Sequence, residues 1–226
     1  MFFYDPTMIL MIPALIFAFW AQWKVKSTFS RYSEVISTRR LTAAQAARYI
    51  LQQNGIHEVE IIHVSGSLTD HYDPRNKKLA LSDDVYNSTS IAAIGVAAHE
   101  AGHAIQHHEG YAPIQLRNLI LPVANLGSWL AFPIFFIGIF FSVSGLMDIG
   151  IIFFIGVILF HIITLPVEFN ASSRAISILR EGNFLNTEEI TGAKKVLNAA
   201  AMTYLSSAAM AVLQLIRLLI LRGNRD

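Results

Sequence analysis

The chain has 226 residues, a formal net charge of +1 and no cysteine. It is 54% hydrophobic and 15% charged, with a mean hydropathy of +0.46, which excludes an ordinary soluble domain and is typical of an integral membrane protein. The small net charge and the scattered basic residues argue against a nucleic-acid partner. Because cysteine is absent, any zinc ion must be bound by histidine and carboxylate side chains.

The first apolar segment carries no charge from residue 6 to residue 23 and is long enough to cross a hydrocarbon core of about 30 Å. Trp20 and Trp23 fit an interfacial belt. Asp5 stands where a signal peptide would have basic residues, so we expect an anchor that is not cleaved. By the positive-inside rule the anchor exits into the cytoplasm, because basic residues follow it at once: Lys24, Lys26, Arg31, Arg39 and Arg40.

A segment with the pattern of a soluble domain follows, from residue 30 to residue 118. Residues 41–53 have helical periodicity, with Thr42 as a suitable N-cap and Asn54-Gly55 as the stop.

Three strands are expected next, at residues 59–64, 68–72 and 77–82. The turn residues Asp73 to Asn76 join the last two as a hairpin. An edge strand of this sheet could hold an extended peptide by backbone hydrogen bonds. The alternative is a sheet that only completes the fold.

The central motif is His99-Glu100-Ala101-Gly102-His103, inside an alanine-rich, proline-free run that predicts one helix from residue 91 to about residue 108. Residues four apart lie about 40° apart around a helix axis, so both imidazoles point the same way. Two neutral histidines so placed can bind zinc, while Glu100 can reach a water molecule on the metal without displacing a ligand. The alternative is a helix whose histidines lie at a polar surface, but the small apolar neighbours indicate burial, where unpaired imidazoles are costly.

A catalytic zinc site needs a third protein ligand. Glu109 stands six residues after His103, as in the metzincin pattern, but that pattern has a glycine where this chain has Gln106, so we discount it. His107 shares a helical face with His103, yet a straight helix carries it away from the metal. We expect His107 either to contact a metal ligand without binding the metal itself or to lie at the surface.

Two further apolar segments, residues 118–147 and 149–167, can each span a membrane. A bend is expected at Pro122 or Pro133, and residues 142–148 form the polar connection. Three crossings return the chain to the cytoplasm, in agreement with the basic residues that follow: Arg174, Arg180, Lys194 and Lys195.

Glu168 follows this third span, which is expected to end at Pro166, and begins what looks like another helix. Three crossings put Glu168 on the same side of the membrane as His99 and His103. It is therefore the best candidate for the third ligand, with one position left for water. The alternative is that Glu168 caps the membrane helix and faces lipid headgroups.

The last apolar stretch, residues 196–216, follows a helix start capped at Asn186 and could form a fourth span. Arg217, Arg222 and Arg225 argue against export of the chain end. A helix that packs against the catalytic part or lies at the interface satisfies both facts, so we prefer three crossings to four.

Three sequence blocks together resemble the YugP-type neutral zinc metallopeptidases of bacterial membranes. They are TDHYDPRNKKLALSDDVY at 69–86, AAHEAGHAIQH at 97–107 and LPVEFNASSRA at 165–175. The resemblance covers nearly the whole chain. It implies a gluzincin-like site in which His99, His103 and Glu168 bind the metal and Glu100 is the catalytic base.

Residues 168–172 are also similar to the Glu-x-x-x-Asp element of the HtpX and Ste24 membrane proteases. The Asp of that element supports the metal site, and this chain has Ser172 in its place. The resemblance therefore shifts the expected supporting role to Asn170 or Arg174.

We expect an α+β, mostly helical integral membrane protein, in which a small β-sheet precedes the zinc helix of a gluzincin-like peptidase domain on three to four transmembrane helices. The expected segments are an anchor (1–29), a cytoplasmic half with the HExxH helix (30–118), a transmembrane hairpin (119–167) and a second catalytic half with the third-ligand helix and an apolar C-terminal helix (168–226).

The expected function is a zinc metalloendopeptidase with one Zn²⁺ per chain, multi-pass in the bacterial plasma membrane, with its active site on the cytoplasmic side. Its partners are the bilayer and polypeptide substrates, membrane proteins among them, and the oligomeric state stays open. A zinc-activated water would attack the peptide carbonyl, with Glu100 as general base and acid. The residue that stabilises the oxyanion is one of four: Arg174, His71, His161 or Tyr111.

Two other classes of function remain open. One is a catalytically silent membrane interaction protein whose structural zinc has four protein ligands. The other is a transport protein, which is disfavoured because only His161 is ionisable within the first three spans.

Overall fold

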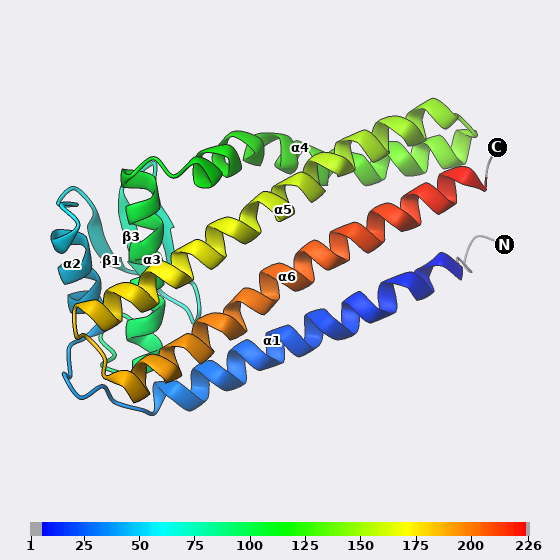
Figure 1. The fold of residues 1–226 in the computed structure, drawn as a ribbon. Helices are drawn as coiled ribbons and strands as arrows, with labels where there is room; N and C mark the ends of the chain where they lie inside the picture. Colours follow the sequence, from blue (N-terminus) through cyan, green and yellow to red (C-terminus); the bar gives the residue numbers. More distant parts are fainter. Residues whose placement is uncertain (1–5, 225–226) are drawn as a thin grey trace. The chain divides into compact units, whose positions relative to one another are not determined.

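The computed structural model describes residues 6–224, so Asp5 and Arg225, which enter the topology argument, lie outside the described residues. Figure 1 shows its helices and strands, coloured along the sequence. The chain divides into two compact units. The described part of unit 1 comprises residues 6–22, 115–166 and 203–224. Unit 2 comprises Trp23–Ile114 and Val167–Met202.

Unit 2 contains the sheet and the central helix. Its strands β1 (Glu60–His63), β2 (His71–Asp73) and β3 (Lys78–Leu81) have the order β1-β3-β2, with β1 parallel and β2 antiparallel to β3. Helix α3 (Ile91–His108) packs against β2, β3 and helix α2 (Ala43–Gln53). The alanines and isoleucines of α3 therefore form the centre of this unit's hydrophobic core.

The local signals for α2 and α3 are confirmed. The Thr42 hydroxyl accepts a hydrogen bond from the Gln45 N–H at 3.2 Å, and the Gln45 side chain accepts one from the Thr42 N–H at 3.0 Å. This capping box satisfies two of the free N–H groups at the helix start. The helix stops where expected, at Asn54 and at Gly55 with φ +71°. Ser90 caps α3 with a single bond, in which its hydroxyl accepts from the Ala93 N–H at 3.2 Å.

The hairpin of β2 and β3 is confirmed, but its first strand lies later than expected. Strand β2 begins at His71, because Gly66 (φ +112°) and Leu68 (φ +56°) take left-handed conformations that a strand cannot contain. Asp70 closes this loop. Its carboxylate accepts from the Ser82 N–H at 2.8 Å and from the Ser82 hydroxyl at 2.9 Å.

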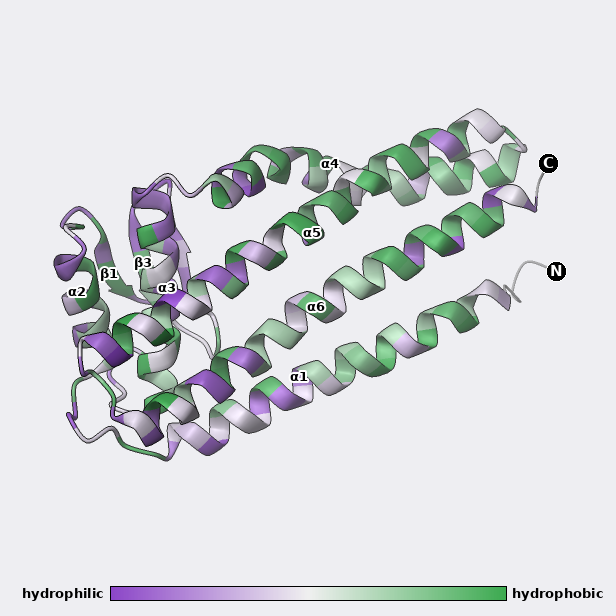
Figure 2. Cartoon of the chain, viewed as in Figure 1, coloured by the Kyte–Doolittle hydropathy of each residue, from purple (hydrophilic) through white to green (hydrophobic). Residues whose placement is uncertain are grey.

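Four helices among the described residues are long and apolar enough to cross a membrane. Figure 2 shows long hydrophobic stretches in them. They are the first helix, Pro6–Ser33, formed by the 3-10 turn η1 (Pro6–Met11) and α1 (Ile12–Ser33), then α4 (Ala112–Phe141), α5 (Ser144–Glu181) and α6 (Thr187–Gly223). Together with the small sheet they confirm the mostly helical fold class.

Two expected breaks are corrected. Only Ser142 and Val143 lie between α4 and α5, because Ser142 makes the turn at φ +54° and residues 144–148 are already helical. The predicted end at Pro166 is wrong, since α5 continues through it to Glu181. A proline inside a helix removes one backbone hydrogen bond but does not stop the helix where the flanking residues remain helical.

The preference for three crossings is replaced by four candidate spans. Residues 203–224 belong to unit 1 rather than packing on unit 2. Within unit 1 the Arg217 guanidinium donates to the Thr7 hydroxyl at 3.2 Å, and the Arg222 guanidinium pairs with the Asp148 carboxylate at 2.9 Å. The end of α6 therefore lies beside the start of the first helix and the start of α5, which requires α6 to run the whole length of unit 1.

Candidate metal centre

Helix α3 supplies two imidazoles on one face. His103 follows His99 by four positions in the helix, and their ring centroids lie 4.7 Å apart. His103 is 8% exposed, and Glu100, the next residue after His99, is 9% exposed. The spacing expected from the sequence thus produces a pair of nitrogen donors, one half-buried (His99) and one buried (His103), with a carboxylate on a neighbouring flank of the helix.

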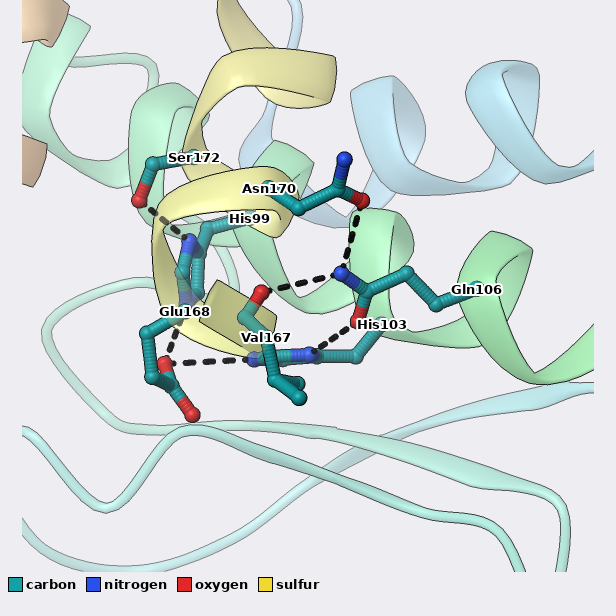
Figure 3. Close-up of polar contacts among 7 residues, drawn as sticks. All are labelled: His99, His103, Gln106, Val167, Glu168, Asn170 and Ser172. Atoms are coloured by element: carbon teal, nitrogen blue, oxygen red, sulfur yellow. Dashed lines mark hydrogen bonds and ion pairs between the residues drawn. The ribbon is translucent and has the colours of Figure 1, made fainter. Parts of the chain in front are cut away.

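Helix α5 supplies the third donor. The Glu168 Oε2 atom lies 3.3 Å from His99 Nε2 and 3.5 Å from His103 Nε2, and Glu168 is 3% exposed (Figure 3). One donor atom from each of these residues lies within 4.8 Å of the other two. Two imidazole nitrogens and one carboxylate oxygen are a donor set that binds zinc.

The close approach of α5 to α3 depends on a glycine within the motif. A Cβ atom at Gly102 would lie 2.9 Å from the Ala171 carbonyl oxygen, closer than real Cβ contacts allow. With no side chain at Gly102, α5 can come near enough for Glu168 to reach both histidines.

A carboxamide fixes the orientation of His103. Gln106 is fully buried, and its Nε2 donates to the Val167 carbonyl and to Asn170 Oδ1, both at 2.9 Å (Figure 3). Its Oε1 must therefore be the acceptor in the 3.0 Å contact with His103 Nδ1. The proton of a neutral His103 then lies on Nδ1, and the lone pair on Nε2 points toward Glu168 and is available to a metal.

His99 has a hydroxyl partner. The Ser172 Oγ atom lies 3.1 Å from His99 Nδ1, one helical turn beyond Glu168 on α5 (Figure 3). Both Nδ1 atoms are thus engaged by protein groups, which leaves both Nε2 atoms directed into the centre.

The network around Gln106 extends to the surface. Asn170 Oδ1 also accepts from the Arg174 guanidinium at 2.8 Å, and Arg174 pairs with the Glu109 carboxylate at 2.7 Å. The guanidinium lies 5.9 Å from the centre of the Tyr111 ring. This chain of contacts ties the end of α3 to α5.

The charges of the centre favour a cation. Burial lowers the pKa of His103, but its hydrogen bond to Glu168 and the charges of Glu100 and Glu168 outweigh burial and raise this pKa above its ordinary value. Without a metal, the two carboxylates thus favour the protonated form of the imidazole, and the same charges would favour a metal ion in its place.

Comparisons with known proteins agree with this geometry. Residues 7–223 match the model of the family described as "Putative neutral zinc metallopeptidase". The chain belongs to this family. It is 46% identical over 218 residues, covering 96% of this chain and 97% of the relative, to the "Putative membrane protease YugP" of Bacillus subtilis (strain 168). No solved structure matches the chain.

Membership of the zinc metallopeptidase family implies zinc, and the three donors fit that ion. Among the described residues, the group that could hold a metal does not include the other residues singled out from the sequence. His107 Nδ1 lies 3.1 Å from the Tyr72 hydroxyl, and Glu109 pairs with Arg174, so both have partners away from the centre. His71 Nδ1 bonds the Thr69 carbonyl on the exposed hairpin, and His161 belongs to unit 1.

Two residues in contact with the two histidines of the candidate metal centre were not predicted. Gln106 was noted only as a departure from the metzincin pattern, although its i+3 spacing from His103 could have indicated contact. Ser172 was expected to lose its supporting role to Asn170 or Arg174. It bonds His99 itself, while Asn170 acts through Gln106 and Arg174 through Asn170.

Proposed function

We propose that this zinc metallopeptidase family member is a membrane-embedded metalloendopeptidase with a gluzincin-like site that hydrolyses peptide bonds. The observation that carries the proposal is the convergence of His99, His103 and Glu168 beside the buried carboxylate of Glu100. We assign the three converging residues to one zinc ion per chain and Glu100 to proton transfer.

His99, His103 and Glu168 would hold a Zn²⁺ ion, which would act there as a Lewis acid and lower the pKa of a bound water molecule to about 7. Glu100 accepts a proton from the attacking water and delivers it to the leaving amine, so one carboxyl serves as base and then as acid. Gln106 and Ser172 hold the two imidazoles with Nε2 toward the centre.

The number of donors supports a catalytic rather than a structural zinc site. Structural zinc sites have four protein ligands, whereas catalytic sites have three and an open position. Within residues 6–224 the group that could hold a metal consists of His99, His103 and Glu168. His107 and Glu109, which the silent interaction protein would need as a fourth ligand, are engaged by Tyr72 and Arg174.

We propose that a polypeptide substrate lies along β2. This strand is an edge of the sheet and packs against α3, the helix that carries the motif. Backbone pairing with an edge strand recognises an extended chain rather than a particular sequence. Segments of membrane proteins are suitable substrates for an enzyme anchored in this way.

We place the centre on the cytoplasmic side of the bacterial plasma membrane. Lys24, Lys26 and Arg31 follow the first span directly, and the positive-inside rule assigns such residues to the cytoplasm.

The decisive test is the Glu100→Gln variant of the full chain, purified in detergent. Wild type is expected to contain about one zinc per chain and to cleave unfolded casein. The variant should keep the zinc and lose turnover. Glu34→Gln, at an exposed position of unit 2, is the matched control and should cleave like wild type. Zinc without turnover in wild type would favour the structural-zinc alternative, and absence of zinc from wild type would reject the proposal.

A further inference from the structure

A cavity of unit 2 lies between the parts of α5 and α6 that belong to this unit, Val167–Glu181 and Thr187–Met202. Its volume is about 300 Å³. Its α5 wall comprises residues 169, 172, 173, 176, 177 and 180. Successive helical residues are rotated by about 100°, so this wall extends from about 40° (Ser172) to about 180° (Ser177) around α5 from Glu168, and Ser172 is its edge nearest the metal centre.

The cavity is basic. Arg180 and Lys194 line it from opposite helices, and no carboxylate is among its lining residues. Within the described part of the chain, neither cation makes an ion pair or a hydrogen bond. Two positive charges that face one cavity without a counter-ion favour an anion there.

The other polar residues that line the cavity favour a phosphate group over a carboxylate as the anion. Ser172, Ser173 and Ser177 present hydroxyls from α5, and Asn198 presents an amide from α6. Together with the two cations these groups offer more donors than the two oxygens of a carboxylate can use, whereas the terminal oxygens of a phosphate group can accept several such bonds. Phe169 and Leu197 add apolar surface suited to a carbon skeleton attached to that phosphate.

One lining residue connects the cavity to the metal centre. Ser172 lines the cavity and also contacts His99 Nδ1 at 3.1 Å. When its oxygen accepts from His99, its own proton is free to be donated to an anion in the cavity. That donation makes the serine oxygen a better acceptor and the imidazole a stronger metal ligand, as a carboxylate partner does in other zinc sites.

We propose that this cavity binds a phosphate monoester or diester, such as the headgroup of an anionic phospholipid or a soluble glycerol phosphate. The bound phosphate tightens zinc binding through Ser172 and His99. Phosphate binding goes beyond the proposed peptidase function and does not depend on it, while the effect on zinc rests on that function's metal centre.

The first experiment titrates the metal-free full chain in detergent with glycerol 3-phosphate by calorimetry. Saturable binding near one per chain is expected. Arg180→Gln with Lys194→Gln should weaken it at least tenfold. The matched control, Arg48→Gln with Lys195→Gln, removes the same charge from exposed positions outside the cavity and should stay within twofold. Equal weakening in both double variants, or no saturable binding to wild type, would overturn the proposal.

Competition experiments show whether the bound phosphate belongs to a lipid or to a soluble molecule. If lipid is the ligand, nanodiscs of phosphatidylglycerol should block glycerol 3-phosphate binding and nanodiscs of phosphatidylcholine should not. If soluble phosphate is the ligand, neither will block it. Competition by acetate at the concentration at which glycerol 3-phosphate acts would overturn the phosphate assignment.

The link to the metal centre is tested by zinc affinity with and without saturating glycerol 3-phosphate. We expect at least threefold tighter zinc binding in wild type and no change in Ser172→Ala. An unchanged affinity in wild type would overturn the link. Since none of these measurements needs turnover, an inactive enzyme would refute the proposed function and leave the phosphate site standing.

Discussion

The two histidines of α3 differ in the groups that hold their Nδ1 atoms, a carboxamide for His103 and a hydroxyl for His99. Neither is a carboxylate, although carboxylates are common partners of metal-bound histidines and raise their basicity. Neutral partners leave the imidazoles weaker donors and a bound zinc ion more electrophilic. At this scale, the atoms beyond the three ligands tune both affinity and reactivity.

Replacing Gln106 with leucine should weaken zinc binding about 10–100-fold, because His103 loses the acceptor that fixes its tautomer and orientation. The buried Val167 carbonyl and Asn170 side chain also lose a donor. Zinc affinity is measured by competition with a chromogenic chelator. Gln52→Leu, at an exposed position of α2, should bind zinc like wild type. A Gln106→Leu protein of wild-type affinity would show that the carboxamide does not position the ligand.

Zinc affinity should rise with pH. The pKa of His103 is raised in the metal-free centre, so this site holds a proton to higher pH than an ordinary histidine, and zinc must displace it. Below that pKa the apparent affinity should increase by about tenfold per pH unit for each proton released. Chelator competition at pH 6, 7 and 8 measures the slope, and an affinity that is flat or falls with pH would contradict the assignment.

At the scale of elements, the centre depends on how closely α3 and α5 pack. Gly102→Ala would place a methyl group 2.9 Å from the Ala171 carbonyl, so the helices must separate and withdraw Glu168 from the histidines. We expect weaker zinc binding and a loss of stability of about 1–3 kcal/mol from overpacking. Gly145→Ala, where a Cβ meets nothing within 4 Å, is the control and should leave thermal unfolding and zinc content unchanged.

The sequence predicts those features of this structure that depend only on residues close to one another along the chain. The Thr42 cap, the Asn54-Gly55 stop and the His99–His103 spacing are local, and each was found where expected. The predicted helix end at Pro166 was wrong, because the effect of a proline on a helix depends on the residues around it. The contacts of Gln106 with Val167 and of Ser172 with His99 join residues 61 and 73 apart, which no local pattern specifies.

At the scale of the whole molecule, two contacts weaken the charge argument that favoured three membrane crossings. Arg217 contacts Thr7, and Arg222 contacts Asp148. Arg222 is paired with a carboxylate in unit 1, which reduces the resistance of this end to export. Four crossings would place the α4–α5 connection and the end of α6 on the outer side of the membrane.

The absence of native cysteine makes this topology directly testable. Asp84, Val143 and Asn224 are each replaced by cysteine in separate variants. Intact cells that carry each variant are then treated with a membrane-impermeant maleimide. We expect labelling at Val143→Cys and Asn224→Cys, and labelling at Asp84→Cys only after lysis. The unsubstituted chain should not react. Protection of Asn224→Cys in intact cells would restore the three-crossing arrangement.

The order of the donors along the chain has a consequence for biogenesis. His99 and His103 are synthesised before α4 and the first half of α5, and Glu168 only after them, on the same uninterrupted helix as residues 144–166. A nascent chain that stalls before or within these apolar segments carries two of the three donors. The complete centre can therefore form only once both segments have left the ribosome, which delays any proteolytic capacity until the chain is ready to enter the bilayer.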